Sequence, residues 1–437
     1  MLRVILSPDS VMMLLLLILG IYLTFRLRFF QVTGLRFIIK NTVGTLLKRD
    51  EDSRAGISPF QAVTTALAGT MGVGNIAGVA TALVSGGPGA IFWMWVSAFF
   101  GMMTKYAEIA LAVRFRVKGA DGLYRGGPMY YMTKLKNGRV LAALFCVICV
   151  ICSFGVGNMT QVNSVSQAAK QVFSIPFWVT GILTAVVLAL IIFGGVRRIA
   201  RATELVIPFI SIIYICFAAA FLWINRAYLS GGLSLIINCA FGPGQALGGV
   251  LGYSAAQAVR LGLSRGVFTN EAGLGSAPIA HASADCKSPG HQGVWGIFEV
   301  FLDTMVVCTI TALVLLTAQG GGLWQGGLDG AALTSAAFES VFGGLGEGFI
   351  AVAIALFAIP SMLGWCFYGE SALSWLTGGN RKATVCYRLV FIMVAVYGAT
   401  AGMASVWAAA DVLNALMALP NIAAIFLLRK HVKISFT

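Results

Sequence analysis

Long apolar runs separated by short polar connections dominate this chain. Eleven stretches are apolar over about the length that a helix needs to cross a bilayer. They cover residues 11–29, 59–84, 89–114, 141–170, 177–195, 203–225, 262–281, 293–318, 348–376, 389–401 and 405–428. The pattern therefore predicts an all-α polytopic membrane protein with 11 spans.

The composition agrees with this pattern. Hydrophobic residues make up 58% of the chain and charged residues 11%, and the mean hydropathy is +0.88, which excludes a soluble globular protein. The 52 glycines are typical of helices that pack closely in lipid. Cys146, Cys149 and Cys152 lie at helical spacing, and we interpret them as small apolar residues and not as a metal site.

The basic residues predict the orientation of the spans. Most Lys and Arg residues lie in alternate connections, which should face the cytoplasm. The net charge of +14 is spread over these loops, so it does not indicate nucleic-acid binding. This places the N-terminus outside and the C-terminus in the cytoplasm of a plasma (inner) membrane. The exceptions are Arg3, Lys170, Arg226, Arg260 and Arg265 at outer ends, and Lys105 within a span.

One apolar segment contains a stretch that should interrupt its helix, TTALAGTMGVGNIAGVA (64–80). Gly69, Gly72, Gly74 and Gly78 remove side chains that favour a continuous helix, so we predict a break near mid-membrane. The freed backbone groups must then be buried against protein or line a polar cavity. There they would offer amides to an anion and carbonyls to a cation. Close packing of small residues is the alternative interpretation.

A second stretch, GVFTNEAGLGSAPIA (266–280), repeats this feature in the later half. Asn75-Ile-Ala-Gly78 is matched by Asn270-Glu-Ala-Gly273. Two interrupted segments at corresponding places in two halves are typical of a transporter with a central site. The halves have opposite predicted orientations, so we expect a five-plus-five inverted repeat with one extra N-terminal helix. The predicted units are the extra helix with a basic interfacial segment (1–58), the first repeat (59–226), an extracellular connection (227–261), the second repeat (262–428) and a cytoplasmic tail (429–437).

Motifs along nearly the whole chain resemble the sodium:alanine/glycine symporter family. The clearest is GGPGAIFWMWVSAFFG followed by MMTKYAE (86–108). Others are SFGVGNMTQVNSV (153–165), TNEAGLGSAPIAHA (269–282), DTMVVCTITALV (303–314), LGWCFYGE (363–370) and DVLNALMALPN (411–421). The resemblance implies the leucine-transporter-like fold and Na⁺-driven uptake of small neutral amino acids, chiefly alanine and glycine. It implies no enzyme activity and no organic cofactor.

The resemblance also implies a substrate site. In it the amides of Gly72, Val73 and Gly74 bind the substrate carboxylate, since backbone donors add no bulk. Asn75 either joins them or holds the break itself. The pocket is completed by the segment Phe268, Thr269 and Asn270, in which Phe268 is an apolar lid or simply a packing residue.

Gln161 and Glu271 each have two interpretations, and Trp365 has a role that follows from its position. Gln161 either accepts from the substrate ammonium or forms an interhelical hydrogen bond. Trp365, one helical turn beyond Ser361, is expected to close a pocket that has room for little more than a methyl group. Glu271 is an intramembrane carboxylate that binds a cation or proton, or pins the unwound backbone. The predicted substrate-binding set is Gly72, Val73, Gly74, Asn75, Gln161, Phe268, Thr269, Asn270, Ser361 and Trp365.

The coupling cation needs oxygen ligands. The resemblance implies the carbonyls of Ala68, Met71 and Phe357 and the hydroxyl of Ser361 as ligands of the co-transported Na⁺. Family members usually carry two hydroxyls here, whereas this chain has one beside Pro360, which also frees a carbonyl. The sequence therefore leaves Na⁺ against H⁺ coupling open.

Other functions have less support. A proton-coupled transporter of the same fold is the nearest alternative, because of Glu271 and the missing hydroxyl. An intramembrane enzyme lacks a motif, since His281, His291 and His431 form no HExxH. A channel has no need of two inverted broken helices. The expected partners are a small amino acid and the lipid bilayer, with no nucleic acid. The oligomeric state stays open, with a monomer as one option.

Overall fold

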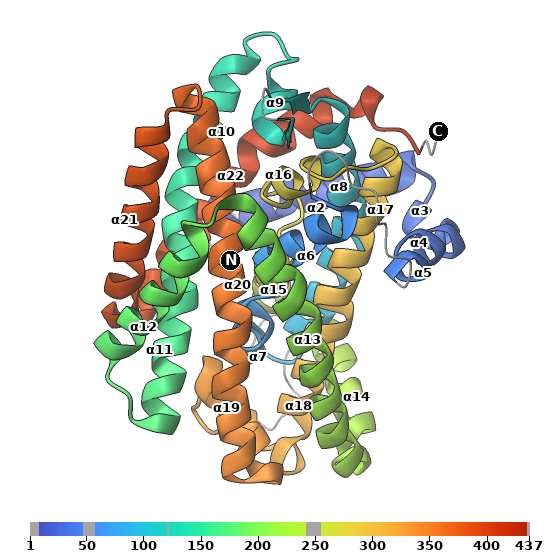
Figure 1. Cartoon of the computed structure of the whole chain (residues 1–437). Coiled ribbons are helices and arrows are strands. Elements are labelled where there is room, and N and C mark those ends of the chain that lie inside the picture. Colours follow the sequence, from blue (N-terminus) through green and yellow to red (C-terminus); the bar gives the residue numbers. More distant parts are fainter. Residues whose placement is uncertain (1–7, 47–56, 120–121, 242–254, 435–437) are drawn as a thin grey trace.

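The computed structural model describes residues 8–46, 57–119, 122–241 and 255–434, and nearly all of them lie in helices that pack side by side (Figure 1). The uninterrupted helices that follow the first break are α8 (Gly89–Arg114), α12 (Phe177–Ile192), α13 (Gly195–Ile224), α20 (Gly344–Thr377), α21 (Arg381–Thr400) and α22 (Met403–Leu427). The structure thus confirms an all-helical architecture, and its apolar helices are compatible with membrane spans.

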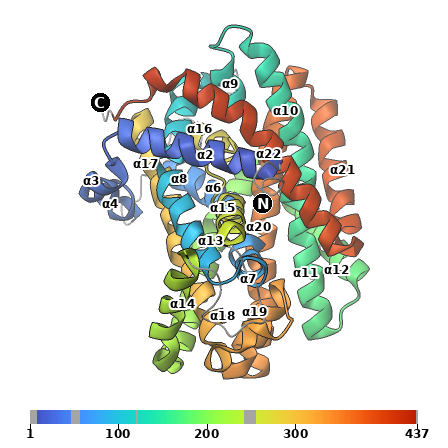
Figure 2. The ribbon, with the colours of Figure 1, turned by 180° about the vertical axis from the view of Figure 1, so that it is seen from behind.

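The number of spans stays a prediction. Seven helical stretches within the described ranges are long and apolar enough to cross a bilayer. Residues 11–26, 77–86 and 177–192 form shorter apolar helices. The first of these belongs to α2 (Pro8–Arg26), which runs crosswise to α11 and α20 in both Figure 1 and Figure 2. It packs on α8 and α22.

The first predicted break is confirmed. The segment consists of α6 (Pro59–Thr70), one short 3-10 turn η1 (Val73–Asn75) and α7 (Ala77–Gly86). Helix α6 starts sharply because Ser58 and Gln61 form a capping box, each side chain bonding the other's backbone N–H at 3.1 Å. After Thr70 the chain leaves the helical path, and Gly72 is extended at φ −119° and ψ −153°.

The second predicted break is confirmed as well. Helix α15 (Ala255–Asn270) ends at Asn270, and a short helix α16 (Ala277–Ala282) follows. Between them Glu271, Gly273 and Gly275 have φ values of 53°, 87° and 84°, which only glycine adopts without strain. Helix α15 begins at Ala255, which lies within the predicted extracellular connection 227–261.

Two other helical segments each contain a π-helical turn. Helix α10 (Gly138–Phe154) continues through η2 (Gly155–Met159) into α11 (Thr160–Phe173). Helix α17 (Pro289–Val300) continues through η5 (Phe301–Cys308) into α18 (Thr309–Thr317). Such turns are frequent at functional sites because the wider turn re-aims the side chains beside it. The turn η5 packs on η1 of the first break, and so does α11, which follows η2.

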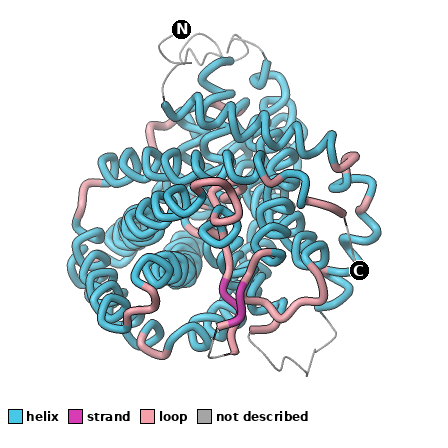
Figure 3. The backbone as a smooth tube through the Cα atoms, turned by 90° about the horizontal axis from the view of Figure 1, so that it is seen from above, coloured by secondary structure: helices cyan, strands magenta, loops and turns pink. Residues whose placement is uncertain are grey.

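Short elements cover the two ends of the bundle. The end that carries the basic connections is uppermost in Figure 1, and we call it the inner end. Figure 3 looks down on it and shows a two-stranded hairpin, β1 (Val117–Lys118) with β2 (Tyr124–Arg125), which pairs antiparallel. The remaining short elements are α3 (Phe30–Thr33), α4 (Leu35–Asn41), α5 (Val43–Leu46), α9 (Pro128–Met132), η3 (Arg226–Tyr228), α14 (Leu229–Phe241), η6 (Ala318–Gly321), η7 (Leu323–Gln325), α19 (Gly330–Phe342) and η8 (Arg429–His431).

Packing brings the first break against the last turn of α15, which leads into the second break. Helix α8 lies against α15 and α17, while α6 lies against α13 and α20. A Cβ built on Gly74 would lie 3.1 Å from the Thr269 methyl carbon, so the opened chain of the first break touches the end of α15. The opened backbone of the first break is therefore buried against protein and away from lipid, as its unpaired polar groups require.

Candidate functional site

The opened backbone of the first break faces two polar side chains. A Cβ built on Gly72 would lie 2.7 Å from Gln161 Oε1 and 3.0 Å from Ser361 Oγ, so this backbone is in direct contact with both groups. The Val73 N–H donates to Gln161 Oε1 at 3.1 Å, and the Ser361 hydroxyl donates to the Gly69 carbonyl at 3.2 Å. Helices α11 and α20 thus supply the partners that the unwound chain lost.

Asn75 anchors the end of the first break. Its Nδ2 donates to Asp303 Oδ1 at 2.6 Å and to the Asp303 carbonyl at 3.3 Å. The Thr304 hydroxyl donates to the same carboxylate at 2.8 Å. Asn75, Asp303 and Thr304 are fully buried, and Asn75 Oδ1 has no hydrogen-bond partner among the described residues. Of the two predicted roles of Asn75, holding the break is the one that these contacts support.

Asp303 is a site residue that the sequence reading missed. It lies in the π-helical turn η5, is fully buried, and accepts only from neutral groups in the contacts named above. A signal was present, since a carboxylate within a span is costly and usually functional. Glu271 and Asp303 share this signal.

Side chains of the second break bond mainly to their own segment. The Thr269 hydroxyl donates to the Gly266 carbonyl at 3.0 Å, and Asn270 Oδ1 accepts from the Ala272 N–H at 3.0 Å. Glu271 accepts from the Ser276 hydroxyl across the bend. Of the two predicted roles of Glu271, pinning the unwound backbone is the one that this contact supports.

Aromatic rings enclose the meeting point of the breaks. Phe268 packs on Trp407 with 5.0 Å between ring centroids, and the Arg265 guanidinium lies 5.5 Å from the centre of the Phe268 ring. Arg265 pairs with Asp411 at 3.0 Å, which joins α15 to α22. This aromatic and charged cover lies on the side away from the inner end. Trp407 and Asp411 are further residues that the sequence reading did not single out.

On the inner side of the breaks Trp365 is fully buried. Its ring meets Tyr368 edge-on at 5.7 Å, and a methyl group on Gly157 would overlap it. Tyr368 is buried too, with its hydroxyl beside Gly69 and without a hydrogen-bond partner among the described residues. Phe268 lies beside the first break, where a Cβ on Gly74 would be 3.5 Å from its ring, and Trp365 lies one helical turn beyond Ser361.

The predicted cation ligands are brought together only in part. Ser361 touches the first break directly, and α20 packs on α6 so closely that a Cβ on Gly364 would lie 3.1 Å from the Gly69 nitrogen. Phe357 lies one turn before Ser361, and its ring packs edge-on against Tyr214 at 5.9 Å. Ala68 and Met71 are buried at the end of α6. Within the described ranges, His, Cys, Asp and Glu side chains form no group of three that could hold a metal ion.

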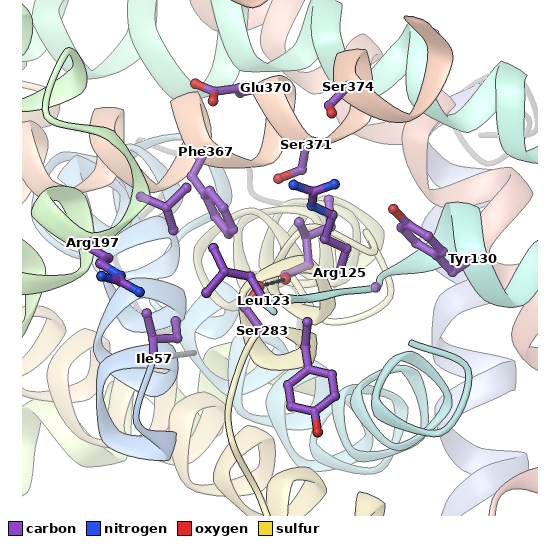
Figure 4. A pocket seen from close by; sticks show the side chains of 14 residues that line it. Ile57, Leu123, Arg125, Tyr130, Arg197, Ser283, Phe367, Glu370, Ser371 and Ser374 are labelled. Carbon is purple, nitrogen blue, oxygen red and sulfur yellow. Dashed lines mark hydrogen bonds between the residues drawn. The ribbon is translucent and has the colours of Figure 1, made fainter. Parts of the chain in front are cut away.

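A separate cavity of about 180 Å³ opens near the inner end (Figure 4). It lies between the hairpin, α16 and the last turns of α20. Glu370, which is one of its lining residues, pairs with Arg388 of α21 at 2.7 Å. The labelled lining residues are Ile57, Leu123, Arg125, Tyr130, Arg197, Ser283, Phe367, Glu370, Ser371 and Ser374. Ser371 is ten positions beyond Ser361, about 15 Å along a helix, so the cavity is distinct from the site at the breaks.

The fold resembles one that is known from solved structures. The structure is similar to the solved structure of MhsT in complex with L-phenylalanine, with a TM-score of 0.60 over 86% of this chain and 90% of that chain, at 13% sequence identity. That likeness shows the leucine-transporter-like fold. Together with the family given in the next paragraph, this fold makes the chain a secondary transporter.

Sequence comparison gives the family. The model of the sodium:alanine symporter family matches residues 3–436, and the chain belongs to this family. The sodium/alanine symporter AgcS of Methanococcus maripaludis is 44% identical over 425 residues, which cover 95% of this chain and 91% of AgcS. GlnT of Bacillus subtilis, named a "probable sodium/glutamine symporter", is 41% identical over 97% of this chain and 86% of GlnT.

A methyl group at Gly72 tests the site. Gly72→Ala should lower substrate affinity at least about tenfold, because the new methyl group enters the contact with Gln161 and Ser361. Gly78→Ala is the matched control, since a Cβ there meets nothing within 4 Å. Binding of small amino acids to the purified variants measures the effect. Equal affinities of the two variants would remove Gly72 from the site.

Proposed function

We propose that this protein takes up small neutral amino acids, chiefly alanine and glycine, by Na⁺-coupled symport with alternating access. The observation that carries the proposal is the contact of Gly72 with Gln161 and Ser361 at the first break, beside the end of α15. Backbone donors at a helix break suit a carboxylate because they are fixed in place and add no bulk. Transport of this kind requires no covalent chemistry.

Both charges of a zwitterionic substrate find partners here. The amides of Gly72, Val73 and Gly74 bind the carboxylate, and the Gln161 carbonyl binds the ammonium. The Val73 N–H donates to Gln161 in this structure, so a carboxylate would take that amide and free the Gln161 oxygen for the ammonium. A neutral amide suits a ligand of zero net charge. Asn75, Thr269 and Asn270 line the far side of the site.

The two aromatic rings at the site, Phe268 and Trp365, limit the size of the substrate side chain. Phe268 is almost fully buried and Trp365 fully buried. Two large buried rings near the opened backbone favour hydrogen or methyl as the substrate side chain. The relative GlnT is named a probable sodium/glutamine symporter, and glutamine has a longer side chain than alanine. The size of the substrate side chain that this site accepts is therefore the property to measure.

For the cation we propose Na⁺ at the carbonyls of Ala68, Met71 and Phe357 and the Ser361 hydroxyl. The support is the close packing of α20 on α6 and the contact of Ser361 with Gly69. Coupling to protons is the second candidate. It is favoured by Asp303, a buried carboxylate whose contacts described above are all with neutral donors, and by the single hydroxyl next to Pro360.

The proposed setting is the plasma (inner) membrane. The basic connections and the C-terminal tail face the cytoplasm, and the N-terminus lies outside. The cluster of Lys and Arg at the inner end supports this orientation. All the proposed binding groups belong to one chain, so a monomer is sufficient for binding.

Uptake by proteoliposomes tests the function. Radiolabelled alanine should accumulate when an inward Na⁺ gradient is imposed, and it should not accumulate with Li⁺ or choline. A pH gradient imposed without Na⁺ is the second arm. Accumulation in that arm alone would establish proton coupling and contradict the Na⁺ proposal. Equilibration without accumulation under either gradient would contradict coupled transport altogether.

The proposed role of Ser361 as a Na⁺ ligand leads to a separate prediction. Ser361→Ala should raise the Na⁺ concentration for half-maximal uptake about tenfold, because a neutral hydroxyl ligand is lost. Ser164→Ala is the control, since that buried hydroxyl donates only to its own helix, at Thr160. An unchanged Na⁺ dependence would exclude Ser361 as a ligand.

The proposed role of Trp365 in limiting substrate size leads to another prediction. Trp365→Ala should broaden specificity, so that leucine or glutamine competes with alanine at least about tenfold better than in the wild type. Removing the indole opens space beside the substrate side chain. Competition against radiolabelled alanine measures the change. A specificity profile like that of the wild type would show that Trp365 packs the bundle and does not limit substrate size.

A further inference from the structure

A buried ammonium lies at the second break. Lys105 is in the middle of α8, and its side chain is fully buried. Its Nζ donates to the backbone carbonyl of Asn270 at 2.9 Å and pairs with Glu299 of α17 at 3.2 Å. An isolated charge in an apolar bundle is strongly unfavourable, so these two partners are required for the lysine to stay there.

The carbonyl that Lys105 contacts is one of those released by the break. Asn270 is the last residue of α15, and the final carbonyls of a helix have no partner within it. A helix C-terminus carries partial negative charge, which a nearby cation stabilises. At this depth water is scarce, so a side chain has to take its place. Lys105 therefore caps α15 at the break.

The same ion pair reaches the other half of the broken segment. Glu299 also bonds His281 of α16 at 3.1 Å, and Gln292 of α17 holds the second ring nitrogen of His281 at 2.8 Å. All four side chains are buried. The chain of contacts from Asn270 through Lys105, Glu299 and His281 therefore fixes α15 and α16 to the same two helices, α8 and α17.

The cap lies next to the proposed substrate site. Thr269 precedes the capped carbonyl, and its methyl carbon is the atom that a Cβ on Gly74 would meet at 3.1 Å. Asn270 Nδ2 donates to the Thr304 hydroxyl at 3.3 Å, beside Asp303. A change in the path of the chain at Asn270 would therefore move one wall of the site. Two further carboxylates, Glu108 and Glu271, are close enough to interact electrostatically with the ammonium.

We propose that Lys105 is a positioning residue for the amino-acid site: held by Glu299, it caps the Asn270 carbonyl and keeps the end of α15 in the geometry that faces the first break. This rests on the proposed function, in which a small amino acid lies between the two breaks. Lys105 acts through Asn270 and Thr269, and it does not touch the substrate. Its charge is balanced by Glu299, so it is not a counter-ion for the substrate.

Two variants that both lack the Glu299 charge test this role. Glu299→Gln removes the carboxylate that holds Lys105 at the Asn270 carbonyl, so the cap is weakened and alanine should bind at least about threefold more weakly than in the wild type. The double variant Lys105→Met with Glu299→Gln removes the bond from Lys105 to Asn270 without leaving an unpaired charge, and alanine should bind at least about tenfold more weakly. Melting temperatures of the purified proteins, measured alongside, report folding independently of binding.

Removal of another ion pair is the matched control. Arg388→Met with Glu370→Gln deletes the pair that joins α21 to α20 near the inner end, and this variant should bind alanine like the wild type. A global loss of stability would weaken binding in both double variants, whereas a positioning role weakens it only in the Lys105 variant.

The outcomes separate this inference from the proposed function. If the wild type does not bind alanine, the proposed function fails. If the wild type binds and the Lys105 double variant binds with wild-type affinity, the positioning role is refuted. Should the double variant not fold, Glu299→Gln decides: weaker binding at an unchanged melting temperature supports the role, and wild-type affinity contradicts it.

Discussion

Backbone N–H and C=O groups inside a membrane protein must find partners within the protein, and the rest of this structure depends on that constraint. Both broken segments free such groups near the centre of the bundle. In the first break Gln161 and Ser361 bond to the opened chain, and in the second Lys105 does so. Each partner comes from a helix distant in sequence. The breaks therefore join distant helices of the bundle, and in the proposed function they also form the binding surface.

The two breaks are stabilised in different ways, which suggests different roles. The first contacts the neutral side chains of Gln161 and Ser361, whose hydrogen bonds a zwitterion can displace at modest cost, and it is anchored at its end by the bond from Asn75 to Asp303. The second is fixed by charged groups, of which Lys105 and Glu299 are fully buried. Breaking a buried pair by removing one partner is strongly destabilising. In the proposed function the second break is therefore a rigid wall, and the first is the adaptable surface.

The sequence predicted the breaks but not most of their partners. Glycine at 69, 72 and 74 is a local signal, and it identified the interruption that the structure shows. The contact of Val73 with Gln161 spans 88 positions and that of Asn75 with Asp303 spans 228, so tertiary packing decides them. The crosswise path of α2 could not be read from hydropathy, because an apolar helix has the same composition whichever way it lies. The resemblance to a family supplied Ser361 and Trp365, which local pattern alone would have missed.

The central claim is that the opened chain at residues 69–75 holds the carboxylate of the substrate. Solid-state NMR can measure the dipolar coupling between ¹³C-carboxyl alanine and protein labelled with ¹⁵N-valine, since Val73 is the one valine in that stretch. The account predicts a coupling that corresponds to about 4 Å, the separation across an N–H to carboxylate hydrogen bond. Bound alanine without any coupling to a valine nitrogen would contradict it.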